Sequence, residues 1–219
     1  MRVARPGGAA DPSQGTAPDE SGQAFSAFDG PSGVLVLHGL TATVATVRPL
    51  AEAIADAGFA VEAPLLPGHG TAPDDLEGKG FGDWLEAAEE AYLSLRARSD
   101  QVLVCGHSLG GTLALALALG HDEIAGLVLV NPFIAPPAES ALAMFRAARE
   151  SGRTQLPAIA GDIAKPGVVE RAYDTVATNA LLSLFDAVGP IAARLGEITC
   201  PVLLMTSRMD HVVPANHAE

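Results

Sequence analysis

The chain has 219 residues, 13 Lys+Arg against 26 Asp+Glu for a net charge of −13, and 48% hydrophobic residues. This length is typical of one globular domain with a sizeable core. Acidic residues are in excess along the whole chain, which argues against nucleic acid or an anionic membrane as a partner, because both require clustered Lys and Arg. A neutral ligand fits the charge better.

The lack of an apolar targeting segment in this sequence and its two cysteines favour a cytoplasmic protein. The longest apolar run, residues 113–119, is about a third of the ~20 residues that a membrane span requires. The N-terminus has no apolar stretch of the kind found in a secretory signal. Cys105 and Cys200 predict neither a disulfide framework nor a metal site. We expect a cytoplasmic protein without a membrane span and with reduced, buried thiols.

Residues 1–22 contain almost no large apolar side chain, which predicts a flexible tail before a domain at residues 23–219. In the first expected helix, Val47, Leu50 and Ile54 recur at helical spacing, and Gly58 follows where a left-handed cap belongs. Apolar runs predict strands at residues 34–38, 59–63, 101–105, 125–130 and 201–205, and helical patterns predict helices at 47–57, 83–98 and 109–119. Continuous apolar strands indicate a parallel sheet with helices on both faces. The predicted fold class is α/β, with a doubly wound, mostly parallel sheet.

The strand rhythm disappears between residues 131 and 194, which are rich in alanine and helical in tendency. A stretch of this length is too long for a simple crossover. We expect a helical insertion at about residues 135–190, over the carboxyl edge of the sheet, with one crossover helix near its end. Its apolar side chains, with Phe133 just before it, are expected to form the wall of an acyl pocket.

The most informative motif is Gly106-His107-Ser108-Leu109-Gly110, which lies between a predicted strand and a predicted helix. Gly-x-Ser-x-Gly in that context is a nucleophile elbow, a turn so tight that the positions two before and two after the serine lack side chains. Ser108 is the expected nucleophile, and the Leu109 amide at the helix N-terminus is an expected oxyanion donor. A dinucleotide-type glycine turn is the alternative, and the strand-to-helix context favours the elbow.

A second oxyanion donor is expected from the loop after the first predicted strand, where His38-Gly39-Leu40 ends the apolar run. The Leu40 N–H would bind the oxyanion, and Gly39 would allow the backbone to approach closely. The His38 side chain is expected to hold the loop in place rather than to react.

Several motifs together resemble the bacterial carboxylesterase and monoacylglycerol-lipase-like group of the α/β-hydrolase superfamily. Besides the elbow and the His-Gly-Leu motif, they are the runs at residues 64–71, 83–84, 127–131 and 210–214. The resemblance covers about residues 30–219. It implies a serine esterase with a small helical cap, nucleophile Ser108, oxyanion amides Leu40 and Leu109, and an acid at Asp210. It also implies that His69, in a loop near the site, is structural.

Asp210 follows the last predicted strand after a short turn, and the chain order Ser then Asp is the expected one. The other common place for the acid is held by Asn131, which cannot be the anionic partner of an imidazolium. Ser207 stands three residues before the acid, where many relatives carry Gly, so the turn departs from the common pattern.

A serine hydroxyl needs an imidazole to take its proton. The resemblance implies a histidine about 25 to 35 residues beyond the acid, whereas the sequence ends nine residues after Asp210. His217 is the only histidine late enough, but residues 214–219 resemble the first turn of a crossover helix. We expect the base, a last strand and a last helix to follow residue 219, so that residues 201–205 form an exposed edge in this sequence; His217 is the alternative base.

The function predicted is hydrolysis of short to medium acyl esters or monoglycerides through an acyl-enzyme at Ser108. No metal or organic cofactor is expected, and a small neutral ester is the expected partner. A serine nucleophile argues against the dehalogenase and epoxide hydrolase chemistries, which use Asp. Two alternatives stay open: a thioesterase or acyltransferase of the same fold, and a truncated or non-catalytic relative that binds an apolar ligand.

Overall fold

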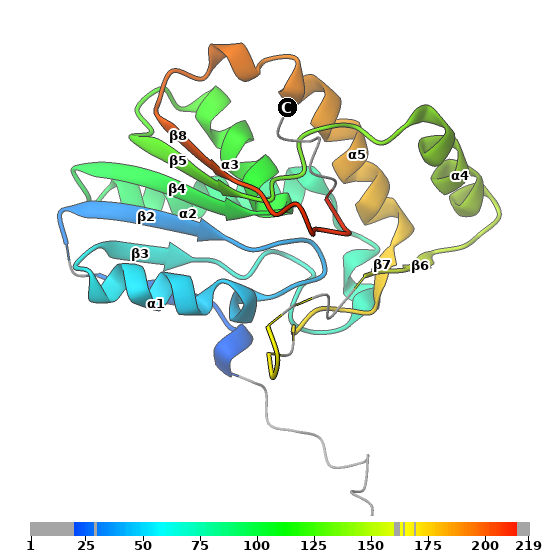
Figure 1. Ribbon diagram of the computed structural model, residues 1–219, viewed down its shortest axis with the longest axis horizontal. Helices are drawn as coiled ribbons and strands as arrows, with labels where there is room; N and C mark the ends of the chain where they lie inside the picture. The colour runs from blue at the N-terminus through cyan, green and yellow to red at the C-terminus, as the bar shows by residue number, and fades with distance from the viewer. Residues whose placement is uncertain (1–19, 29, 160–162, 164, 169, 214–219) are drawn as a thin grey trace, which may run out of the picture.

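A computed structural model describes residues 20–28, 30–159, 163, 165–168 and 170–213 (Figure 1). Its centre is a six-stranded sheet in the order β1-β3-β2-β4-β5-β8. All neighbouring strands are parallel except β1, which pairs antiparallel with β3. The strands are β1 Phe25–Ala27, β2 Ser32–Leu37, β3 Ala60–Ala63, β4 Gln101–His107, β5 Gly126–Val130 and β8 Val202–Met205. The predicted α/β class and parallel sheet are confirmed.

Helices cover the sheet on both faces. α1 (Arg48–Asp56) packs on β3, while α2 (Phe81–Arg96) and α3 (Leu109–Gly120) lie on the opposite face, as Figure 1 shows. α5 (Thr178–Ala192) extends the second layer by packing on α2 and α3. The amide of Gly80, just before α2, donates to the Asp83 carboxylate at 2.9 Å, so α2 begins two residues earlier than predicted.

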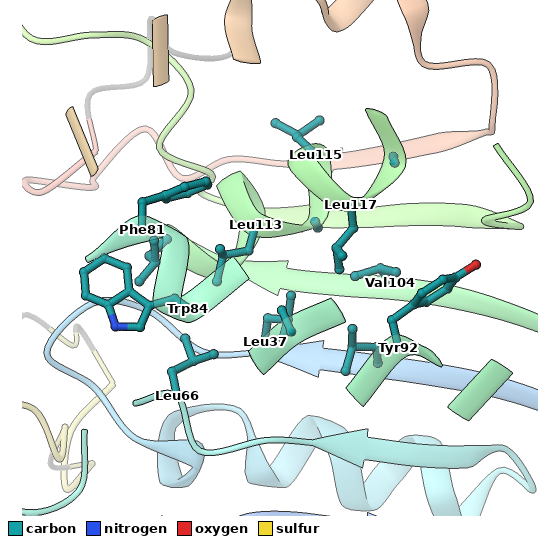
Figure 2. Packing of buried hydrophobic residues seen from close by; sticks show 14 of the residues in the cluster. Leu37, Leu66, Phe81, Trp84, Tyr92, Val104, Leu113, Leu115 and Leu117 are labelled. Carbon is teal, nitrogen blue, oxygen red and sulfur yellow. The ribbon is translucent and has the colours of Figure 1, made fainter. Parts of the chain in front are cut away.

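The main core lies between the sheet and the α2 and α3 layer. Figure 2 shows Trp84 and Tyr92 of α2 packed with Leu113 and Leu117 of α3 over the sheet residue Leu37. Trp84, Tyr92 and Leu113 are completely buried. Burying a side chain of this size contributes roughly 1.5–3 kcal/mol, so this layer contributes substantially to the stability of the fold.

The face of α1 differs from the predicted one. Val47 and Ala51 are buried, whereas Leu50 is 41% exposed and lines a cavity described below. Gly58 has φ 91°, which confirms the left-handed cap after the helix.

The insertion is less helical than predicted. It contains α4 (Glu139–Glu150) and a separate antiparallel pair, β6 (Gln155–Pro157) with β7 (Thr175–Ala177), before the crossover helix α5. Figure 1 shows these elements beyond the carboxyl ends of the parallel strands. The expected helices are present as α4 and α5, and the short β6–β7 pair is an addition that the sequence pattern did not predict.

The predicted tail at residues 1–22 falls largely outside the described residues. The last three residues of this range form a helical turn, η1 (Glu20–Gly22). The predicted C-terminal boundary of the tail, residue 22, is therefore too late in the chain. Arg48 holds this end of the chain by donating from Nε to Ser21 O at 2.7 Å and from Nη2 to Gln23 O at 2.8 Å.

β8 is the last strand in the order of the sheet and pairs only with β5 among the described strands. Its four apolar side chains, Val202 to Met205, are each 39–56% exposed. The predicted exposed edge is therefore present in the structure. Among the described helices, none has the length and apolar character to cross a membrane.

Candidate active site

Ser108 lies in a sharp turn between the end of β4 and the start of α3. Its backbone has φ 53° and ψ −116°, a strained conformation for a non-glycine residue. A Cβ on Gly106 would lie 2.1 Å from Gly110 O, and a Cβ on Gly110 would lie 2.2 Å from Leu37 O. Both glycines of the motif are therefore required by the backbone, and the predicted elbow geometry is present.

The loop expected to supply the second oxyanion donor lies beside the elbow. β2 and β4 pair in register, with Leu37 opposite Gly106, so the chain leaves both strands at the same edge of the sheet. A Cβ on Gly39 would be 3.4 Å from the Ser108 Cβ. Leu109 is the first residue of α3, where backbone amides lack helical partners. The structure thus brings the loop that contains Leu40 and the start of α3 next to Ser108.

His38 ties the loop at residues 39–41, called the oxyanion loop for its expected role, to the loop at residues 65–71. Leu66 N–H donates to His38 Nε2 at 3.1 Å, which makes Nδ1 the protonated nitrogen, and Nδ1–H donates to Gly39 O at 2.9 Å. Burial, with the nearby His69 ring, lowers the pKa of His38 to about 3. His38 is therefore a neutral buried link, as the sequence predicted.

His69 is the second buried imidazole of this region. Its Nδ1 is 3.2 Å from Leu66 O and 3.2 Å from Pro67 O, and its ring lies 4.9 Å from His38 and 5.8 Å from Trp84 between centroids. Trp84 Nε1 donates to Pro67 O at 3.0 Å. Burial lowers the pKa of His69 to about 4. These contacts fit the structural role expected for His69.

Asp210 follows β8 in a turn held by the main chain. Its Oδ1 accepts from Val212 N–H and Val213 N–H, each at 2.8 Å. Ser207 N–H donates to the Asn131 Oδ1 at 2.7 Å, and Asn131 itself has φ 42°. Serine at position 207 is therefore compatible with the turn. Asn131 joins the turn that contains Asp210 to the end of β5, a role that sequence reasoning missed.

The remaining described histidines occupy three different settings. His107 and His211 adjoin Ser108 and Asp210 in the chain. Burial lowers the pKa of His107, against the opposing attraction of the Glu170 and Asp210 carboxylates. His121 ends α3, where its Nε2 is 2.9 Å from the Glu89 carboxylate. His217 lies outside the described residues.

Ser108 and Asp210 both line one cavity of about 900 Å³. Phe133 lies in its wall, with its ring centroid 5.5 Å from Phe185, which in turn lies 5.4 Å from Phe145. The sequence had not suggested that Leu50, Glu170 and Arg171 also line this cavity. Within the described part of the chain, no group of three or more His, Cys, Asp or Glu side chains is arranged to hold a metal ion.

The model of the alpha/beta hydrolase family matches residues 34–219. The chain belongs to this family. A thermostable monoacylglycerol lipase from Bacillus sp. (strain H-257) is 42% identical over 199 residues, which are 89% of this chain and 77% of that protein. A carboxylesterase from Bacillus subtilis (strain 168) is 28% identical over 200 residues, 89% of this chain and 78% of that protein.

Solved structures agree with this assignment. A structure from work on the metagenome-derived lipolytic enzymes LipS and LipT has a TM-score of 0.82 and 33% identity, and covers 89% of this chain and 79% of that one. A monoacylglycerol lipase from Paleococcus ferrophilus shares the fold, with a TM-score of 0.68 at 20% identity and coverage of 90% and 82%. These hydrolytic relatives favour ester hydrolysis over the acyltransferase, thioesterase and non-catalytic alternatives.

Proposed function

We propose that this protein is a serine carboxylester hydrolase that forms an acyl-enzyme at Ser108. The proposal rests on the strained elbow at Ser108. The Gly39-Leu40 loop packs against this elbow, and residues of both line the same cavity. The named lipase and esterase relatives support the same chemistry.

In the proposed reaction, Ser108 Oγ attacks the ester carbonyl and the alcohol leaves as the acyl-enzyme forms. The Leu40 and Leu109 amides stabilise the oxyanion of each tetrahedral intermediate. Water then attacks the acyl-enzyme and releases the acid. Asp210, with Oδ1 held by two backbone amides, orients the histidine that moves the proton in both steps.

We place that histidine C-terminal to Val213. His38 and His69 are engaged in the loop network, and His121 pairs with Glu89. The chain order Ser, Asp, His of α/β-hydrolases places the base after the acid. Replacing His217 by Ala tests one candidate: loss of activity identifies His217 as the base, and retained activity excludes it.

We assign the acyl chain to the part of the cavity walled by Phe133, Phe145 and Phe185, with the insertion at about residues 135–190 acting as the cap. Aromatic contacts of this kind favour an apolar chain over a peptide or a phosphorylated group. The expected substrates are neutral short to medium acyl esters and monoglycerides.

The test is a comparison of Ser108→Ala with Ser94→Ala, which removes the hydroxyl of an exposed serine on α2. On p-nitrophenyl esters and monoglycerides, the full-length Ser108→Ala protein should lose on the order of 10⁶ in kcat. The Ser94→Ala protein should keep wild-type turnover. Activity retained in Ser108→Ala would refute the assignment of the nucleophile.

We also place the protein in the cytoplasm. Cys105 and Cys200 are both free thiols; Cys105 is buried as predicted, whereas Cys200 is only partly buried, and burial raises the pKa of Cys105 to about 11. Unpaired, unreactive thiols are typical of a reducing compartment. Fractionation of the native cells tests this placement.

A further inference from the structure

The turn that carries Leu40 contains a threonine in a conformation that normally requires glycine. Ala42 N–H donates to Gly39 O at 3.3 Å and closes the turn, and Thr41, at the third position, has φ 64°. Positive φ at this position favours Gly or Asn, and it is an outlier for a β-branched residue. Such a conformation persists only where surrounding contacts hold it.

The contacts on the turn come from the segment of the insertion that leads into β7. Tyr173 N–H donates to Thr41 O at 2.9 Å. Beside this bond, Ala42 and Ala172 form an antiparallel bridge. The cap segment is therefore joined directly to the strained residue of the oxyanion loop.

The side chain of Tyr173 fixes this segment from its other side. Its hydroxyl accepts from Thr71 N–H at 2.9 Å and donates to Gly68 O at 3.4 Å. Both partners lie in the loop at residues 65–71, which His38 links to the start of the oxyanion loop. The phenol thus sets the position of its own backbone amide relative to Thr41.

We propose that Tyr173 is a positioning residue for the oxyanion hole. Its hydroxyl keeps its backbone amide on Thr41 O, which holds Thr41 at positive φ and so keeps the Leu40 N–H in place. This inference rests on the proposed ester hydrolysis. Tyr173, a residue of the insertion, contributes to that reaction by holding the Leu40 N–H in place. It also couples the position of the insertion to the geometry of the oxyanion loop.

The first test compares Tyr173→Phe with Tyr92→Phe in the full-length protein. Both changes remove one hydroxyl and keep the ring, and Tyr92 is buried in the α2 layer of the core. Tyr173→Phe should lower kcat about tenfold with KM changed less than about twofold, a smaller loss than the ~10²–10³ for deletion of an oxyanion donor. Tyr92→Phe should leave kcat unchanged. Equal kcat in Tyr173→Phe and wild type would overturn the proposal.

The second test repeats Tyr173→Phe in a Thr41→Gly background. Glycine adopts positive φ without steric strain, so the turn no longer depends on the tyrosine hydroxyl. Tyr173→Phe should then change kcat by less than about twofold. A merely structural role for Tyr173 predicts the same tenfold loss in both backgrounds, and that result would overturn the proposal.

The third test needs no catalysis. Hydrogen exchange of the Ala42 amide reports opening of its bond to Gly39 O. Tyr173→Phe should raise its exchange rate about tenfold, and Thr41→Gly should abolish that difference. If exchange responds in this way and no ester is hydrolysed, the proposed function fails while the positioning role stands. Unchanged exchange in Tyr173→Phe overturns the positioning role.

Discussion

At the residue scale, the glycines of the elbow explain why this strand-to-helix turn can be predicted from the sequence. Gly106 and Gly110 approach backbone carbonyl groups so closely that any Cβ would collide with them. The collision involves backbone atoms, which cannot rotate away as a side chain can. The two glycines of the motif therefore follow directly from the geometry of the turn.

Substituting Gly110 by Ala should destabilise the protein severely. The new Cβ would lie 2.2 Å from Leu37 O, so α3 or β2 must shift, and we expect a loss of about 3 kcal/mol or more, at or beyond the usual range for overpacking. Urea unfolding followed by circular dichroism measures the change.

Gly120→Ala is the matched control in the same helix. A Cβ at position 120 meets no atom within 4 Å, so this change should be neutral or stabilise by up to about 1 kcal/mol. Equal stability of the two variants would contradict the steric explanation.

The structural role of Asn131 could not be predicted from the sequence. The sequence indicates only that this amide cannot be the acid. Its bond to Ser207 N–H joins positions 76 residues apart, and nothing local to either residue signals the contact. The role of Tyr173 is hidden for the same reason, because its partners are about a hundred residues away in the chain.

At the scale of elements, His38 and His69 make the junction of two loops sensitive to acid. Burial keeps both rings neutral, with pKa values of about 3 and about 4. In the unfolded chain each has a pKa near 6.5, so the unfolded state binds protons first as the pH falls. Their contribution to stability is complete above about pH 6.5 and decreases toward pH 4.

The free energy of unfolding should therefore fall between pH 7 and pH 4.5, with about 2 to 3 kcal/mol lost for each of the two histidines. Replacing His38 or His69 by Gln removes one titrating group and should flatten the dependence in proportion. Urea titrations at several pH values measure the slope. A slope identical to wild type in both variants would show that other groups cause the acid sensitivity.

α4 should be the first helix of the described fold to open. None of its residues is buried, whereas α2 buries five. Its Arg146 pairs with Glu139 at 3.7 Å and Asp186 at 3.4 Å, but exposed ion pairs stabilise little. Opening α4 exposes little apolar surface and so has a small free-energy cost.

Limited trypsin digestion should therefore cut within α4, after Arg146 or Arg149, before it cuts within α2. Mass spectrometry of the early fragments identifies the order. Earlier cleavage in α2 would mean that α4 is held more firmly than its burial indicates.

The long elements were predictable and the short ones were not. α1 to α3 and the parallel strands each contain enough residues for their apolar pattern to show. β1, β6 and β7 have three residues each, too few to establish a period. Their pairing depends on partners elsewhere in the fold, which is why the insertion was expected to be helical.

At the scale of the whole molecule, a polypeptide of residues 1–219 combines the exposed strand β8 with a net charge of −13, and these two features act in opposite directions on self-association. Like charge keeps copies of the chain apart. An unpaired apolar edge is a template on which another copy can pair.

A polypeptide of residues 1–219 carrying Leu203→Lys should associate less than the unmodified one, because a charge on the edge strand opposes pairing. Leu93→Lys, at a 49% exposed site on α2, makes the same change in net charge away from the edge. It should raise association slightly by reducing overall repulsion. Sedimentation velocity over a concentration series separates the two effects, and the same direction of change in both variants would contradict edge pairing.

The chain contains a single tryptophan, Trp84, and it lies beside the buried histidine pair. All tryptophan fluorescence of this chain therefore comes from an indole next to His69, in the loop junction that supports the oxyanion loop. An imidazolium ring at this distance quenches indole fluorescence, whereas a neutral imidazole does so weakly. An acid titration of native protein should thus show emission dimming first, as His69 gains its proton. The emission maximum should shift to longer wavelength only when water reaches the indole. The emission intensity therefore reports protonation of His69, and the wavelength of the maximum reports unfolding.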